Sequence, residues 1–174
     1  AGQELLGKSD KELAKIRGRD IAMVFQDPSR SLNPTMKIGR QIGESLRLHT
    51  DLSKSDIKQK VIELMHAVQL QDPEKLASRY PHELSGGQQQ RVAIARALIN
   101  DPVIIFGDEP TGNLDPETTE EIMNLLFQIG KDLGTAIVMA THDYIVINKY
   151  PARMIRTEGG KVIDNANIAS SSMH

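Results

Sequence analysis

The stretch from Leu84 to Asp115 reads LSGGQQQRVAIARALINDPVIIFGDEPTGNLD. It contains a Ser-Gly-Gly turn, a helix predicted to begin near Gln88, an apolar strand and a closing tight turn. Apolar side chains at helical spacing indicate the helix, and Asp101-Pro102 stops it. The order of these pieces predicts an α/β unit.

The Ser-Gly-Gly turn is a candidate anion site. Ser85, Gly86 and Gly87 offer a hydroxyl and two positions without side chains, so backbone N–H groups can approach a ligand closely. The positive end of the helix that begins near Gln88 points the same way. Taken alone, such a turn is more often a helix start without a ligand. The motifs that follow favour the anion site.

Two adjacent carboxylates follow the apolar run of residues 103–106. This run fits a strand buried on both faces of a parallel sheet, and ligands bind at the C-terminal edge of such sheets. Asp108 and Glu109 point in opposite directions if the chain stays extended, which predicts separate roles. We assign Asp108 to Mg²⁺ through water and Glu109 to the attacking water. The alternative is two solvated acids in a loop.

Three motifs in this order resemble the ATP-binding subunits of ABC transporters: LSGGQ at residues 84–88, the strand ending in Asp108-Glu109, and Asn113-Leu114-Asp115. The resemblance implies an ATPase that uses ATP and Mg²⁺, with Glu109 as the catalytic glutamate of the Walker B strand. It also implies a signature motif that contacts the γ-phosphate of a nucleotide held by the opposite subunit, and a D-loop. The implied ATP-binding residues are Ser85, Gly86, Gly87, Gln88 and Asp115.

Two further strand ends agree with this resemblance. His142 follows the apolar run of residues 136–140, where the family has its switch histidine. Gln26 follows residues 21–24, where the family has its Q-loop glutamine. The implied catalytic residues are therefore Glu109, His142 and Gln26, and the implied metal-binding residues are Asp108 and Gln26. A lone histidine after a strand is more often structural, so this role depends on the other motifs.

The first residues contain a pattern that allows two readings. Gly2, Gly7, Lys8 and Ser9 fit the phosphate-loop pattern G-x-x-x-x-G-K-[ST]. A working phosphate loop follows a buried strand, however, and only one residue precedes Gly2. Ser9 and Glu12 instead predict a capping box for a short helix through residue 15. We favour the capping box, which makes the chain an N-terminally truncated subunit whose Walker A motif is missing.

Residues 35–82 are predicted to form an all-helical subdomain within an ATPase core of residues 1–34 and 83–174. After a loop at 29–36, Ile38, Ile42 and Leu46 mark one helix, a stronger one begins near Ser53, and a third begins at Asp72-Pro73. In the family, the coupling helix of a membrane subunit binds at this subdomain and the Q-loop.

The part after the D-loop continues the α/β pattern. We predict a helix capped by Asp115 and closed by Gly134, a strand at 136–140, and a short helix at 144–149. Strands at 153–157 and 161–163 are predicted to flank a Gly-Gly turn. Residues up to about 84 resemble the di- and oligopeptide importers, whereas later residues resemble the cell-division and lipoprotein-release branch. The chain is thus either an unusual natural member or a chimera.

Composition sets outer bounds on the function. The 174 residues suit one domain with a subdomain, and a net charge of −2 gives no basic footprint for nucleic acid. The absence of cysteine suits a reducing cytoplasm. No apolar run approaches the roughly 20 residues that span a bilayer, and no secretory signal is visible. We expect a cytoplasmic protein that lies on the inner face of the cell membrane through its partners.

These patterns predict a P-loop NTPase-like α/β fold, with a mainly parallel sheet flanked by helices and the helical insertion between Q-loop and signature. The predicted function is an ATP-hydrolysing subunit that drives transport. Its expected partners are a second nucleotide-binding subunit, identical or not, and transmembrane permease subunits. The alternatives are a catalytically incompetent fragment and a non-transport ATPase of the same fold.

Overall fold

The computed structural model describes residues 4–14 and 16–165. It divides the chain into two compact units, residues 1–140 and residues 141–174. Within the described part of the chain, no helix combines the length and apolar character needed to cross a membrane. The division predicted from the sequence, with a core of residues 1–34 and 83–174 around a subdomain of residues 35–82, stays a prediction.

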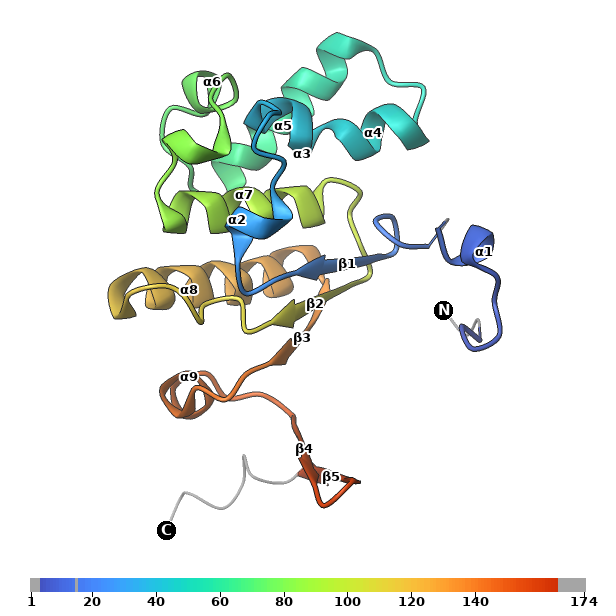
Figure 1. Cartoon of the computed structure of the whole chain (residues 1–174), viewed down its shortest axis with the longest axis vertical. Coiled ribbons are helices and arrows are strands. Elements are labelled where there is room, and N and C mark those ends of the chain that lie inside the picture. Colours follow the sequence, from blue (N-terminus) through green and yellow to red (C-terminus); the bar gives the residue numbers. More distant parts are fainter. Residues whose placement is uncertain (1–3, 15, 166–174) are drawn as a thin grey trace. The chain divides into compact units, whose positions relative to one another are not determined.

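The first unit is built on a parallel three-stranded sheet. Its strands are β1 (Ile21–Val24), β2 (Ile104–Asp108) and β3 (Ala136–Ala140), in the order β1-β2-β3. The register pairs Val24 with Gly107, and Asp108 with Ala140. The carboxyl ends of β2 and β3 therefore lie at the same edge. This arrangement confirms the predicted α/β class with a parallel sheet (Figure 1).

In the first unit, two long helices cover one face of this sheet. Ile105 is buried, whereas its neighbour Phe106 is 39% exposed. The covered face packs against α7 (Gly86–Leu98), which contacts β1, and α8 (Pro116–Leu133), which contacts β3. The prediction that residues 103–106 are buried on both faces is therefore wrong, because the side chains of Val103 and Phe106 are exposed.

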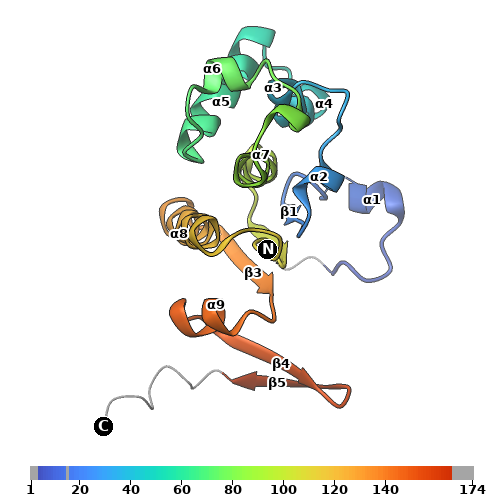
Figure 2. The same ribbon diagram turned by 60° about the vertical axis from the view of Figure 1, so that its left-hand side comes forward.

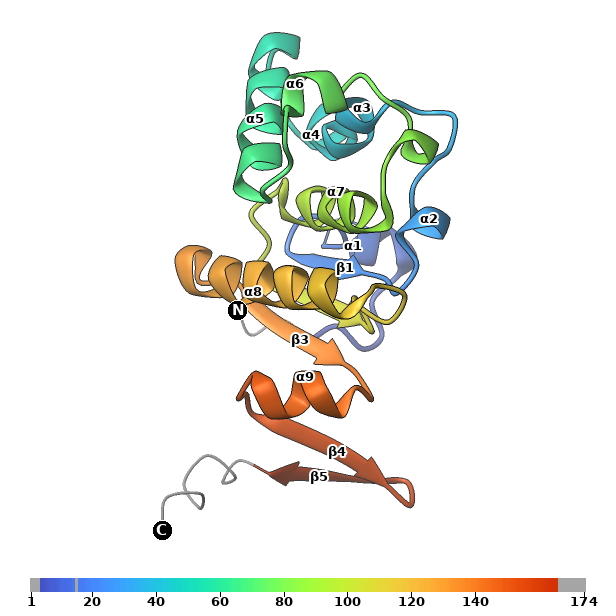
Figure 3. The same ribbon diagram turned by 90° about the vertical axis from the view of Figure 1, so that its left-hand side faces the viewer.

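Helix α7 is the centre of the first unit. It lies between the sheet and the helices of residues 38–76 (Figure 3), and Figure 2 views it end-on. It contacts α8, α2 (Pro28–Ser31), α3 (Ile38–Ile42) and α5 (Lys54–Ala67). Eight of its 13 residues are buried, including the polar Gln90 and Arg91.

Between the sheet's first strand and α7, the chain is helical. Besides α2, α3 and α5, the elements of this segment are α4 (Glu44–His49), α6 (Pro73–Leu76) and the 3₁₀ turn η1 (Pro81–Glu83). Two predictions are wrong here. The helix expected across Ile38 and Leu46 is broken at Gly43 into α3 and α4, and the loop expected at 29–36 begins with α2, which Asp27 caps.

Half of the predicted capping box near the N-terminus is present: Glu12 accepts the Ser9 N–H, but the Glu12 N–H donates to the Ser9 carbonyl at 3.0 Å and not to the Ser9 hydroxyl. Ser9 donates through its backbone N–H and its hydroxyl to the Glu12 carboxylate, at 2.9 and 2.6 Å, ahead of α1 (Asp10–Ala14). Of the competing phosphate-loop pattern, Gly2 lies outside the described residues, as does residue 15, where the predicted helix was to end.

The second unit contains the predicted helix and hairpin. Helix α9 (Tyr144–Lys149) begins at Asp143, whose carboxylate accepts the N–H groups of Ile145 and Val146. Strands β4 (Met154–Glu158) and β5 (Lys161–Asn165) pair antiparallel around Gly159 and Gly160.

Candidate functional site

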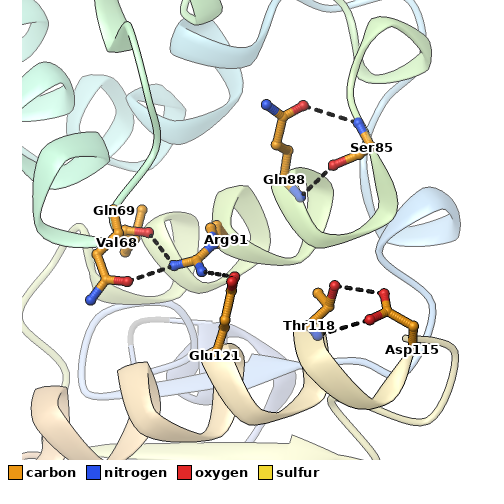
Figure 4. A network of polar contacts seen from close by, with 8 residues as sticks. All are labelled: Val68, Gln69, Ser85, Gln88, Arg91, Asp115, Thr118 and Glu121. Carbon is orange, nitrogen blue, oxygen red and sulfur yellow. Dashed lines mark hydrogen bonds and ion pairs between the residues drawn. The ribbon is translucent and has the colours of Figure 1, made fainter.

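The predicted anion site opens α7 with a reciprocal cap. The Ser85 hydroxyl oxygen accepts the N–H of Gln88 at 3.3 Å, and the Gln88 side-chain oxygen accepts the N–H of Ser85 at 3.0 Å (Figure 4). This is the capping box that favours helix initiation. The Ser85 hydroxyl keeps its own proton to donate, and Ser85 and Gly86 are exposed. The helix begins at Gly86, two residues earlier than predicted.

The two signature glycines pack against the start of α8. A Cβ atom at Gly87 would lie 2.7 Å from the Thr118 Cγ2 methyl, so no side chain fits there without displacement. At Gly86 the nearest atom, in Leu114, would lie at 3.6 Å, an ordinary contact. The structure therefore brings the signature turn and the predicted D-loop side by side.

Asp115 caps α8. Its carboxylate accepts the Thr118 backbone N–H at 3.0 Å and the Thr118 hydroxyl at 2.6 Å (Figure 4). These bonds, the hydroxyl bond first, lower the pKa of Asp115 below its ordinary value. The sequence predicted this cap, and the carboxylate remains exposed to a ligand. Its role in ATP binding stays a prediction.

Asp108 and Glu109 stand at the carboxyl end of β2, as predicted. Asp108 is the last strand residue and is exposed. Glu109 has a backbone φ of +43°, the left-handed region that non-glycine residues rarely adopt. Its N–H donates to the Ala140 carbonyl at 2.9 Å, and its carbonyl accepts the N–H of Gly112 at 2.9 Å. The chain is therefore no longer extended at Glu109, where a turn of residues 109–112 begins, so the extended backbone assumed for the opposite directions of the two carboxylates is not present.

Gln26 lies against this turn. It follows β1 by two residues, and its side-chain nitrogen would be 2.7 Å from a Cβ atom at Gly112. Gly112 is bonded to the Glu109 carbonyl. The predicted Q-loop glutamine and the turn of residues 109–112 thus lie together. A side chain at position 112 would displace Gln26.

Gln90 belongs to the same region and was missed by the sequence analysis. It is fully buried on α7, and its side-chain nitrogen donates to the backbone carbonyls of Pro110 at 2.5 Å and Phe25 at 3.3 Å. Helical spacing places it four residues before Ile94 and eight before Leu98, both buried. That spacing was the available signal that Gln90 faces inward.

The oxygen groups at this edge fit Mg²⁺ in the way that nucleotide sites use it. Mg²⁺ keeps several waters and takes one or two protein ligands together with substrate phosphates. The exposed Asp108 carboxylate and the Gln26 amide are suitable groups. Within the described residues, no cluster of three or more His, Cys, Asp or Glu side chains could hold a metal by itself. His142 lies in the second unit, so its role beside Glu109 stays a prediction.

Comparisons with known proteins agree with this set of motifs. A family model described as ABC transporter matches residues 2–112. The oligopeptide transport ATP-binding protein OppD of Bacillus subtilis (strain 168) is 40% identical over 167 residues, covering 96% of this chain and 47% of that protein. OppD of Escherichia coli (strain K12) is 39% identical over 166 residues, covering 95% and 49%. The chain spans about half the length of these curated relatives.

A solved structure gives the same result for the fold. A dimeric ATP-binding cassette in a post-hydrolysis state, bound to ADP and Pi, matches with a TM-score of 0.77 and 35% sequence identity. The match covers 91% of this chain and 68% of that chain. The family model alone accounts for more than half of the residues, so this chain belongs to the ABC transporter family of ATP-binding proteins.

Proposed function

We propose that this chain carries the hydrolytic part of an ATP-binding subunit of an ABC transporter. The observation that supports this most is the turn of residues 109–112, which holds Glu109 at the carboxyl edge of the sheet with Gln26 against it. In this proposal Glu109 positions and polarises the attacking water. Gln26, in the loop after β1, senses the γ-phosphate.

The signature turn serves a different nucleotide from Glu109 and Gln26. Two subunits close around two ATP molecules, and residues 85–88 of one face the phosphates held by the other. The exposed Ser85 hydroxyl and the N-terminus of α7 are suited to an anion. The dimeric cassette with ADP and Pi, to which this chain is similar, supports a dimer.

Asp108 and Gln26 would hold Mg²⁺ in the nucleotide complex, where the ion neutralises phosphate charge. His142, from the segment after β3, stabilises charge that develops on the transferred phosphoryl group. The similarity to oligopeptide transport proteins supports peptides as the transported substrate. Permease subunits then link the chain to the inner face of the cell membrane.

The role of Glu109 is tested by Glu109→Gln in an otherwise complete pair of ATP-binding subunits, in which a phosphate loop is present. Loss of the carboxylate removes the group that polarises water, so we expect kcat to fall at least about a hundredfold while the Kd for ATP changes little. The matched control is Glu74→Gln, an exposed acid on α6. Unchanged turnover in Glu109→Gln would contradict the proposed function.

The N-terminal pattern is tested separately. We propose that Lys8 is not a phosphate-loop lysine, because Ser9 is engaged in capping α1. Calorimetry with ATP and Mg²⁺ should then show the same negligible ATP binding for the unchanged chain, for Lys8→Ala and for the control Lys11→Ala. Selective loss of ATP binding in Lys8→Ala would establish a working phosphate loop.

A further inference from the structure

The buried amide of Gln90 connects three segments of the site. Gln90 sits on α7, one turn beyond the signature glycines, and is 0% exposed. Its nitrogen donates to the carbonyl of Pro110, which directly follows Glu109, and to the carbonyl of Phe25, which directly precedes Gln26. One side chain on the signature helix thus holds the backbone next to both residues.

Stability alone does not account for a glutamine at this position. Its side-chain oxygen is buried and accepts no hydrogen bond from the residues that the structure describes. A buried acceptor without a donor opposes folding, whereas an apolar side chain of similar size has no such atom. What the amide adds is the pair of N–H bonds to the two carbonyls.

The backbone at Glu109 needs such support. A φ of +43° at a non-glycine residue is strained, and such strain persists only where the surrounding structure holds it. The backbone of Glu109 is bonded on both sides, from its N–H to the Ala140 carbonyl and from the Gly112 N–H to its own carbonyl. The Gln90–Pro110 bond fixes the next peptide group. This bond comes from α7.

We propose that Gln90 is a positioning residue that couples the signature turn of this chain to its own Gln26 and Glu109. The inference rests on the proposed function, in which the signature serves one nucleotide and Gln26 with Glu109 serves the other. When phosphate binds at the N-terminus of α7, the amide transmits the helix position to residues 25 and 110. Each nucleotide site then senses the occupancy of its neighbour.

The first test is hydrogen exchange on the chain itself, with Gln90→Met, which keeps the length of the side chain and removes both N–H groups. We expect the amides of Glu109 and Gly112 to exchange at least about tenfold faster, because their turn loses its anchor. Gln41→Met is the matched control. Gln41 is also buried, and its amide donates to the carbonyls of Asn33 and Met36, at 2.8 and 2.7 Å. The Gln41→Met substitution should accelerate amide exchange near residues 33–36 and leave the exchange rates of the Glu109 and Gly112 amides unchanged.

The second test is ATP turnover by an otherwise complete pair of subunits, in which a phosphate loop is present. Gln90→Met should lower kcat about 10- to 100-fold, leave KM within about twofold and reduce the Hill coefficient for ATP, whereas Gln41→Met should alter none of these. A purely structural role would not separate kcat from KM or change cooperativity. If the Gln90→Met variant does not fold, Gln90→Asn replaces it in both tests, because the shorter side chain moves the amide away from the two carbonyls.

The outcomes separate the two proposals. Unchanged exchange at Glu109 and Gly112 in the Gln90 variants overturns the coupling, whatever the turnover. Failure of both Gln90 variants to fold, while Gln41→Met folds, also overturns it, because Gln90 is then a residue of the core. Absence of turnover in complete subunits that carry a phosphate loop and no substitution contradicts the proposed function, and exchange still decides the role of Gln90.

Discussion

Gly86 and Gly87 are adjacent in the sequence, yet the structure assigns them different constraints. A methyl group at position 87 would collide with Thr118, whose hydroxyl is held by Asp115 at 2.6 Å and whose side chain therefore cannot turn away freely. We expect Gly87→Ala to destabilise the chain by about 1–3 kcal/mol through overpacking. Urea unfolding measures this free energy.

The neighbouring glycine supplies the control. Position 86 has room for a methyl group, and alanine is a better helix former than glycine, so Gly86→Ala should change the unfolding free energy by less than about 1 kcal/mol in either direction. Equal effects of the two substitutions would show that the contact between α7 and Thr118 does not limit this position.

The Asp115 cap predicts a dependence of stability on pH. Its pKa is lowered in the folded chain by the bonds from Thr118. Its ionised form therefore stabilises the fold above the pKa of the unfolded chain, and this contribution is lost as the pH falls through the lower, folded pKa. We expect the difference in urea midpoint between the unchanged chain and Asp115→Asn to shrink as the solution is acidified below about pH 4.

This comparison isolates one carboxylate. The pKa values of Asp20, Asp27 and Asp164 are also lowered, so both proteins lose stability in acid. Asparagine keeps a capping oxygen without the charge. A constant difference between the two midpoints from neutral to acidic pH would mean that Asp115 has no ionised cap.

At the scale of elements, Arg91 ties three helical segments together. Its guanidinium donates to the Val68 carbonyl and the Gln69 side chain, both at 3.1 Å, at the end of α5, and to Glu121 of α8 at 2.8 Å (Figure 4). The Arg91 side chain is 10% exposed, whereas that of Glu121 is 56% exposed. The buried bond to the Val68 carbonyl should therefore matter more than the ion pair.

Substitution separates these contributions. We expect Arg91→Met to lower the unfolding free energy by about 2–4 kcal/mol, since it leaves a buried carbonyl without its donor. Glu121→Gln should cost less than about 1 kcal/mol, because the lost charge is largely solvated. Thermal unfolding of both variants checks the order, and a larger loss in Glu121→Gln would contradict it.

Elements with strong local signals were predictable, and tertiary contacts explain the rest. Asp115 and Gly134 mark the ends of α8 as the sequence indicates. The break between α3 and α4 at Gly43 was not predicted from the sequence, since Ile38, Ile42 and Leu46 keep helical spacing across it. A Cβ atom at Gly43 would lie 2.9 Å from Ile57, so close packing of α5 accompanies the break. That contact joins residues 14 positions apart and is invisible to periodicity.

The site also combines features that the sequence predicts with features that depend on tertiary contacts. The types and order of Gln26, Asp108 and Glu109 were readable, because each follows an apolar strand. The left-handed backbone at Glu109 was not, since a glutamate gives no local sign of positive φ. Gln90 was hidden among three consecutive glutamines, of which only this one is buried. Its importance comes from carbonyls 65 and 20 positions away.

At the scale of the whole molecule, exposed apolar side chains on the sheet predict how this chain associates in solution. The register places Met23, Phe106 and Val138 next to one another across the three strands. They are 46%, 39% and 46% exposed, so apolar side chains form a continuous exposed row. Contiguous exposed apolar surface promotes association.

We therefore expect the chain on its own to bind a hydrophobic dye and to self-associate as its concentration rises, which sedimentation velocity measures. Phe106→Lys places a charge in the middle of the row and should shift the sample towards monomer and lower dye binding several-fold, because a charged group resists burial against another apolar face. Leu48→Lys is the control, since Leu48 is 74% exposed on α4, away from the sheet. If both lysine variants reduce association equally, net charge is the cause; if only Phe106→Lys does so, the sheet face is the surface that associates.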